Sequence, residues 1–146
     1  MDIEQMDRLL QEHIPLCAFM KLEVRSLGRN LIKSSAPLAP NRNMHGTGFA
    51  GAQYSLAVAT GWALVHNRLD VAGAEGQLVV KEATFHYKRP VTASMELEAV
   101  FDIDVSDDEL RRQLAINGRV AFPLIVNVNS KGKRCGYLEA NYIVIA

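Results

Sequence analysis

Residues 43–57 read NMHGTGFAGAQYSLA, a glycine-rich loop that runs into an alanine-rich segment, and this stretch decides the fold. Between Arg42 and Arg68 only two histidines can carry a charge near neutral pH. From Phe49 to about Asn67 apolar residues occupy almost the whole circumference of a helix. A helix that is apolar nearly all round must be covered on most sides. The sequence therefore predicts one long buried helix here.

A membrane span is the alternative for this uncharged stretch. A spanning helix needs about 20 predominantly apolar residues. The stretch contains four glycines and several polar side chains, among them Gln53, Ser55 and Thr60, and its first part is loop-like. A helix buried within a protein that does not span a membrane is the better interpretation.

The residues before this helix predict one helix and two strands. Apolar residues recur at helical spacing from Ile3 to Ile14, and Pro15 ends that helix. Alternation over residues 19–27 indicates a strand, and a turn at 28–30 leads into a second strand at 31–38.

After the helix, the pattern predicts a turn, four strands and a short helix. The alternation from Met95 to Ile103 gives a strand with one wet face. Ser106 to Glu109 is a capping-box pattern that opens a helix ending near Gly118. The remaining expected elements are a turn at 73–76, a strand at 77–87, and strands at 119–129 and 135–145 joined by a turn at 130–133.

This order predicts a single α+β domain over residues 1–146. We expect a curved antiparallel sheet of about six strands wrapped around one long central helix. The order of elements alone leaves several α+β folds open.

Composition excludes several classes of protein. The 16 basic and 16 acidic residues balance, so no basic stripe for nucleic acid is expected. Cys17 and Cys135 have no partner at zinc-ligand spacing and are expected to be reduced thiols. The acidic, amphipathic start is unlike a signal peptide, so a cytoplasmic location is expected.

The loop and helix resemble the signature of hot-dog thioesterases, Asn-x-x-Gly-Thr-x-His-Gly-Gly followed by a helix with Leu-Ala-Asp. The residues that match are Asn43, Gly46, Thr47, Gly51, Leu56 and Ala57. The later Phe85-His-Tyr-Lys-Arg-Pro-Val91 is similar to the hot-dog strand that flanks the acyl tunnel. The order of elements agrees over nearly the whole chain, so the resemblance implies a hot-dog fold.

Two positions depart from that signature. Phe49 replaces the usual His, and Val58 stands where the catalytic Asp or Glu would be. No Asp or Glu occurs from Met44 to Leu69, so the helix offers no general base, which hydrolysis normally needs to activate water.

The narrower YiiD C-terminal family, labelled "putative thioesterase", is the better match. It shares the Asn-x-Asn…Gly-Thr-x-Phe-x-Gly and Gly-Trp patterns found at Asn41–Gly51 and Gly61-Trp62. Its characterised members are malonyl-acyl-carrier-protein decarboxylases that help to start fatty acid synthesis. The resemblance therefore implies decarboxylation of malonyl-acyl-carrier protein or malonyl-CoA to the acetyl thioester.

Decarboxylation needs hydrogen-bond donors aimed at the enolate oxygen, in a site that excludes water. We expect Asn43 and a backbone N–H at the helix N-terminus to supply them. The alternative for Asn43 is a loop residue that bonds its own backbone. His45 is the candidate acid or donor, with an exposed or structural role as its alternative.

Further residues are expected to contact substrate, although each has a packing or loop alternative. Lys88 and Arg89 would attract an acidic carrier or its phosphopantetheine, or be ordinary solvated strand-end residues. Ser55 is a poor nucleophile without a base. The whole set is Gly46, Thr47, Phe49, Gly51, Tyr54, Ser55, Val58, Phe85, Lys88 and Arg89.

The expected partner is acyl carrier protein or a CoA thioester, with no metal and no cofactor beyond the phosphopantetheine of that carrier. The resemblance implies a homodimer or a dimer of dimers, because hot-dog sites generally lie between two subunits. Two other functions stay open: an acyl-thioester hydrolase whose base comes from elsewhere, and a non-catalytic domain that binds an acyl carrier.

Overall fold

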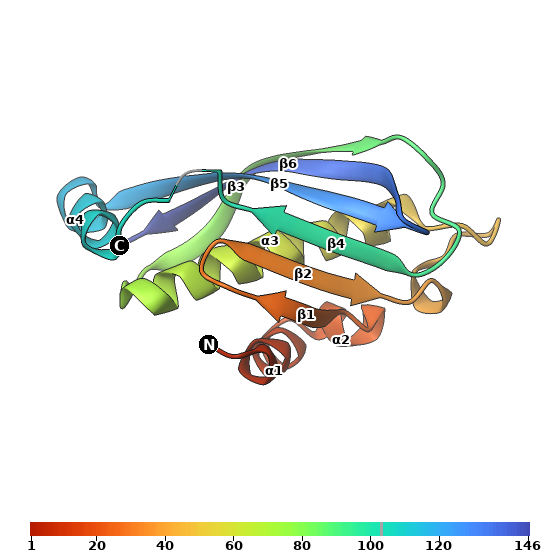
Figure 1. Cartoon of the computed structure of the whole chain (residues 1–146), viewed down its shortest axis with the longest axis horizontal. Helices are drawn as coiled ribbons and strands as arrows, with labels where there is room; N and C mark the ends of the chain where they lie inside the picture. Colours follow the sequence, from red (N-terminus) through yellow and green to blue (C-terminus); the bar gives the residue numbers. More distant parts are fainter. Residues whose placement is uncertain (103) are drawn as a thin grey trace.

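A computed structural model describes residues 1–102 and 104–146, and within them six antiparallel strands form one sheet in the order β1-β2-β4-β5-β6-β3. Figure 1 shows helix α3 along one face of this curved sheet, with α1 and α2 beyond β1. The elements are α1 (Ile3–His13), α2 (Pro15–Met20), β1 (Glu23–Leu27), β2 (Leu31–Ala36), η1 (Ala39–Asn41), α3 (Ala50–Ala72), β3 (Gln77–Tyr87), β4 (Met95–Val100), α4 (Asp107–Asn117), β5 (Arg119–Ser130) and β6 (Lys133–Ile145). The predicted α+β class and sheet are confirmed.

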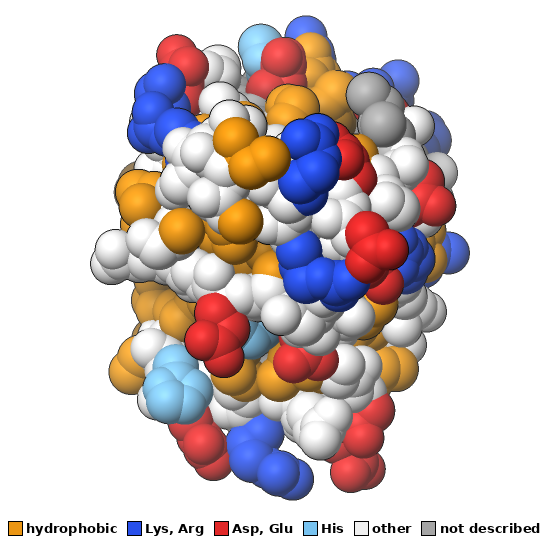
Figure 2. All heavy atoms as spheres, turned by 90° about the vertical axis from the view of Figure 1, so that its left-hand side faces the viewer, with side chains coloured by type: hydrophobic (Ala, Val, Ile, Leu, Met, Phe, Trp, Pro, Cys, Tyr) orange, Lys and Arg blue, Asp and Glu red, His pale blue; other side chains and the backbone are white. Residues whose placement is uncertain are grey.

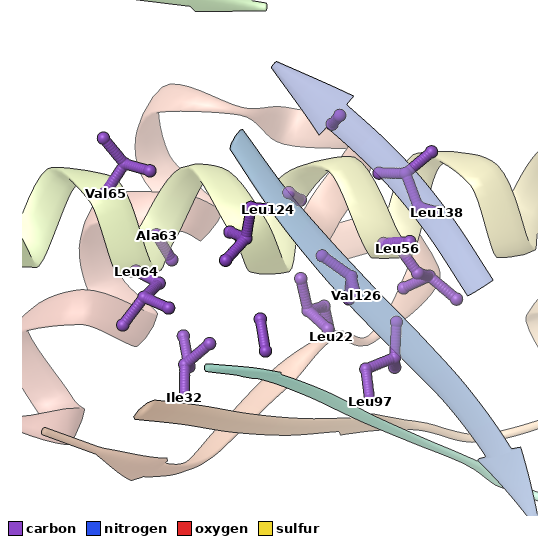
Figure 3. Close-up of a cluster of buried hydrophobic side chains, with 14 of the residues drawn as sticks. Leu22, Ile32, Leu56, Ala63, Leu64, Val65, Leu97, Leu124, Val126 and Leu138 are labelled. Carbon is purple, nitrogen blue, oxygen red and sulfur yellow. The ribbon is translucent and has the colours of Figure 1, made fainter. Parts of the chain in front are cut away.

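The core lies between α3 and the sheet. Alternate residues of the strands point to α3, as the period of a strand requires. Leu56 and Leu64 of α3 meet side chains from several strands (Figure 3). Those side chains include Ile32 of β2, Leu97 of β4 and Leu138 of β6, all at most 1% exposed. Each such side chain contributes about 1.5–3 kcal/mol on burial, so the position of α3 explains why residues 50–67 contain no Asp, Glu, Lys or Arg.

Gly61 allows β6 to approach α3 closely. A Cβ atom at Gly61 would lie 2.8 Å from Cζ of Tyr142 and closer still to its hydroxyl oxygen. The fully buried Tyr142 uses that space to donate a hydrogen bond of 2.7 Å to the carbonyl of Val58. The glycine of the Gly-Trp pattern is therefore required by packing.

The strand predicted at residues 19–27 is wrong in its first part. Pro15 ends α1 but also occupies the first turn of α2, which continues to Met20. Proline suits the first helical position because the N–H that it lacks would have no partner there. Lys21 then takes a left-handed conformation with φ of 57°, and β1 begins only at Glu23.

Helix α3 extends five residues beyond its predicted end near Asn67. It stops at Ala72 because Gly73 adopts φ of 64°, with its N–H bonded to Asp70. The N–H of Ala74 bonds to the carbonyl of Leu69, which completes a common glycine-dependent helix end. Strand β2 ends at Ala36 instead of residue 38, before Pro37, and β4 ends at Val100. The predicted strand residue Ile103 lies outside the described residues.

The other local predictions are confirmed, except that only the Ser106 half of the predicted capping box forms. The side chain of Ser106 accepts from the N–H of Glu109 and caps α4, although Glu109 itself pairs with Arg112. Lys131 and Gly132, with φ of 52° and 72°, form the tight turn between β5 and β6. Both cysteines are free and buried.

Candidate active site

The loop before α3 is closed by the side chain of Asn43. Its Oδ1 accepts hydrogen bonds from the N–H groups of His45 at 2.9 Å and Thr47 at 3.1 Å. Its Nδ2 donates to Oγ1 of Thr47 at 2.8 Å. Gly46 adopts φ of 79°, a left-handed conformation that glycine takes at no steric cost. The loop alternative for Asn43 is thus realised, and the second N–H of its amide has no acceptor among the described residues.

A second set of contacts fixes where this loop meets α3. The N–H of Gly48 donates to the carbonyl of Val91 at 2.8 Å, and the Gly48 carbonyl accepts from Nε2 of Gln53 at 3.1 Å. A Cβ atom at Gly48 would lie 2.8 Å from Cβ of Val91, so only glycine fits between the two segments. Sequence reasoning did not identify Gly48 or Val91, whose contact depends on the tertiary fold.

Asn41 has a structural role before α3. It is 1% exposed, and its Nδ2 donates to the carbonyls of Met20 at 2.9 Å and Pro37 at 2.8 Å. Its own carbonyl accepts from the N–H of Phe49 at 2.8 Å. Asn41 therefore ties α2, the end of β2 and the start of α3 together and is not placed to meet a substrate.

The N-terminus of α3 presents unpaired backbone donors. Phe49 is the N-cap residue and provides no side-chain hydrogen bond. Within the described chain, the N–H groups of Ala50, Gly51 and Ala52 have no protein acceptor, whereas that of Gln53 bonds to Phe49. These groups carry the positive end of the helix dipole. A Cβ atom at Gly51 would lie 2.7 Å from the Phe49 ring, so this glycine makes room for that ring.

The end of β3 lies against this helix N-terminus. The hydroxyl of Tyr87 donates to the carbonyl of Ala50 at 2.7 Å. The rings of Tyr87 and Phe85 are 4.3 Å apart between centroids. Burial raises the pKa of Tyr87, and the nearby Tyr54 phenol raises it further. Tyr87 was not singled out from sequence, although it stands two residues beyond the predicted Phe85.

The remaining predicted residues take two kinds of position. His45 is exposed at the loop, and the Lys88 and Arg89 side chains are exposed after β3. Tyr54, Ser55 and Val58 lie on the part-exposed side of α3, which continues to Trp62 and His66, whose rings stack at 4.8 Å. Along α3, the residue at the position of the usual catalytic carboxylate is the part-buried Val58.

The predicted residues form an open surface. Two hollows of about 640 Å³ and 600 Å³ occur elsewhere, the first beside α4 and β5 and the second beside β1, β2 and β4. None of the predicted site residues lines either hollow. The loop, the start of α3 and the end of β3 therefore lie outside both hollows, on a surface where Phe49, Tyr54 and Tyr87 are exposed.

Two features of the described residues bear on other classes of function. Neither α3 nor any other described helix is long and apolar enough to cross a membrane. No group of three or more His, Cys, Asp or Glu residues suited to a metal ion occurs among the same residues.

Comparison with known proteins assigns nearly the whole chain to one family. A family model described as "Putative thioesterase (yiiD_Cterm)" matches residues 3–146. A "putative thioesterase" structure from Shewanella oneidensis has 27% identity and a TM-score of 0.87, covering 99% of this chain and 97% of that chain. A "probable thioesterase" from Pseudomonas aeruginosa has 23% identity and a TM-score of 0.83, covering 99% and 96%. A Chlorobaculum tepidum protein of unknown function has 21% identity and a TM-score of 0.85, covering 97% and 93%. The fold is the hot-dog fold.

Proposed function

Because this chain belongs to the YiiD C-terminal family, described as a "putative thioesterase", we propose that it acts on acyl thioesters and decarboxylates a malonyl thioester. One observation carries this proposal. The start of α3, seven residues after Asn43, offers N–H donors that have no acceptor among the described residues, and α3 has no carboxylate where a hydrolytic base would stand. That combination suits enolate stabilisation better than activation of water.

The reaction requires little of the protein besides these donors. The bond between the malonyl methylene and its carboxylate breaks, and its electron pair moves into the thioester to give an enolate while carbon dioxide leaves. A proton then adds to the methylene carbon, which gives the acetyl thioester. The free amide N–H of Asn43 and the N–H of Gly51 are the groups that we assign to the enolate oxygen. His45 is the candidate that returns the proton.

Apolar side chains on this open surface support the same chemistry once a second copy of the chain covers them. Phe49, Val58 and Phe85 lie on the wall formed by α3 and β3. An apolar environment disfavours the free carboxylate of the substrate and favours its departure as neutral carbon dioxide. Tyr54 and Ser55 would border the same wall.

We also propose that a second copy of the chain completes the site. β3 is the last strand of the sheet, with β6 as its neighbour, so its outer edge offers unpaired backbone groups over 11 residues. Val79 and Val80 on this strand are 37% and 36% exposed. Light scattering should give the mass of a dimer or a dimer of dimers, and a monomer would remove this proposal.

Hydrolysis is the second candidate, favoured by the thioesterase descriptions of the family and of its structural neighbours. Mass spectrometry of malonyl-acyl-carrier protein incubated with the enzyme separates the two reactions. Acetyl-carrier as the product supports decarboxylation, and free carrier supports hydrolysis. Asn43→Ala should abolish formation of acetyl-carrier. Undiminished activity in that variant would remove Asn43 from the mechanism.

A further inference from the structure

Two segments that are distant in sequence bring five cations together at one end of the molecule. Lys88 and Arg89 follow β3, and their N–H groups donate to the carbonyl of Cys135 at 2.8 and 2.9 Å. Cys135 is the third residue of β6, shortly after the β5–β6 turn. The five side chains, all exposed, belong to Lys88, Arg89, Lys131, Lys133 and Arg134, and we call them the strand-end cation surface.

These cations differ from those at the opposite end of the molecule. Around α4, arginines pair with acids of the same chain, for example Arg68 with Asp107 at 2.7 Å. Figure 2 views that end and shows Lys or Arg side chains directly beside Asp or Glu side chains. The further arginines paired there are Arg29, Arg111 and Arg112.

Within the described chain, none of the five cations forms an ion pair. Oε1 of Glu139, the acid on β6 that comes soonest after Arg134, lies 2.9 Å from Nε2 of His86 and pairs with none of the five cations. Arg134 lies over the ring of Tyr137, 4.0 Å from its centroid. This contact holds the guanidinium without neutralising it. The strand-end cation surface is therefore a region of uncompensated positive charge on a chain whose formal net charge is zero.

The surface adjoins the candidate active site. Tyr87, which bonds to Ala50 at the start of α3, directly precedes Lys88. Val91, which accepts from Gly48 of the active-site loop, comes two residues after Arg89. Figure 1 shows the end of β3, the β5–β6 turn and the start of α3 at the same end of the molecule. A partner bound on this surface would thus lie beside the wall to which we assign the thioester.

We propose that the strand-end cation surface docks the acidic face of an acyl carrier protein. This rests on the proposed function and names the partner of the same site. The cations extend over a strand end and a turn, and none of them lines either hollow. A small phosphate group requires converging donors, whereas the broad acidic face of a protein complements a spread surface. Such charges chiefly accelerate encounter and weaken with added salt.

The test compares a charge-reversed enzyme with a matched control. Lys131→Glu/Lys133→Glu changes the net charge by −4 within the surface, at two residues outside the set expected to contact substrate. Arg8→Glu/Arg119→Glu makes the same change at two exposed arginines that form no ion pair in the described structure. Calorimetry with a purified holo-acyl carrier protein that bears no acyl group measures docking. Turnover of malonyl-carrier and of malonyl-pantetheine, which lacks the protein, measures the chemistry.

We expect the surface variant to bind the carrier at least about tenfold more weakly than wild type, with a correspondingly lower kcat/KM for malonyl-carrier. Its kcat/KM for malonyl-pantetheine should be unchanged, and the control variant should resemble wild type in all three assays. Equal carrier binding by the surface variant and wild type overturns the docking proposal, as does a wild type that does not bind the carrier. If only the surface variant loses carrier binding, the docking proposal is supported. If wild type binds the carrier but turns over neither thioester, only the proposed function is overturned.

Discussion

The hydroxyl of Tyr87 donates a hydrogen bond of 2.7 Å to the carbonyl of Ala50, across 37 residues of sequence. It joins the end of β3 to the first residue of α3. The N–H groups of the same helical turn are those that we assign to the enolate oxygen. Their direction therefore depends on how firmly β3 holds the start of the helix.

Replacing Tyr87 by Phe tests this dependence. The variant keeps the ring and loses one hydrogen bond, which is worth about 0.5–1.5 kcal/mol. We expect kcat for malonyl thioester decarboxylation to fall by roughly fivefold, which corresponds to about 1 kcal/mol, with little change in KM. Tyr137→Phe is the control, because the Tyr137 hydroxyl has no hydrogen bond within the described residues. An unchanged kcat in Tyr87→Phe would show that this contact does not position the donors.

Asn43 has a loop role and a proposed catalytic role, and Asn43→Asp separates them. The carboxylate still accepts from the N–H groups of His45 and Thr47, so the loop and the melting temperature should be retained. It offers no N–H donor and places negative charge beside the enolate. We expect kcat to fall by about a hundredfold or more, as in the loss of an oxyanion donor.

Thr47→Val provides the matched comparison for Asn43. It removes the hydroxyl that accepts from the Asn43 amide and leaves that amide intact. Activity should remain within a few-fold of wild type. If Asn43→Asp is active, or if Thr47→Val loses activity to the same degree, Asn43 serves only to shape the loop.

The fold could be predicted from sequence where a pattern is local. Strand alternation and the uncharged run through α3 required no knowledge of distant contacts. The end of α3 was misplaced because Arg68, which resembles a surface residue in sequence, is 3% exposed and pairs with Asp107. From sequence, Pro15 predicts only the end of a helix, although proline also suits the first position of the next helix.

The sequence predicts which segment carries the candidate site, but not which distant segments contact it. The segment from Asn43 to Thr47 forms its own hydrogen bonds, so its residue types carry the information. The contacts of Gly48 with Val91 and of Tyr87 with Ala50 join distant segments, and nothing in the local pattern specifies them. Among the paired arginines near α4, Arg111 and Arg112 follow their acids by three residues, whereas nothing in the local pattern joins Arg29 or Arg68 to Asp107.

Gly61→Ala should be strongly destabilising. The new Cβ atom would lie 2.8 Å from Cζ of the buried Tyr142, which cannot move without loss of core packing and of its bond to Val58. We expect unfolding in urea to show a loss of about 3 kcal/mol. Gly73→Ala is the comparison: its site is open but has φ of 64°, so the cost should be about 1 kcal/mol. A Gly61→Ala variant no less stable than Gly73→Ala would contradict the close approach of β6 to α3.

Stability should also fall on acidification because of His66. Burial lowers the pKa of His66 below 6.5; Asp70 opposes this effect, and the N-terminal ammonium adds to it. Since the folded-state pKa is the lower one, the unfolded chain binds the proton more readily. The contribution of His66 to the free energy of unfolding is thus fully present above about pH 6.5 and is lost as pH falls through the folded-state value.

An NMR titration of the imidazole should give a pKa below 6.5 for His66. The decline of the melting temperature between pH 7 and pH 5 should be shallower in His66→Gln. A His66 pKa at or above 6.5, or identical declines in the two proteins, would show that burial against Trp62 does not disfavour the charged ring.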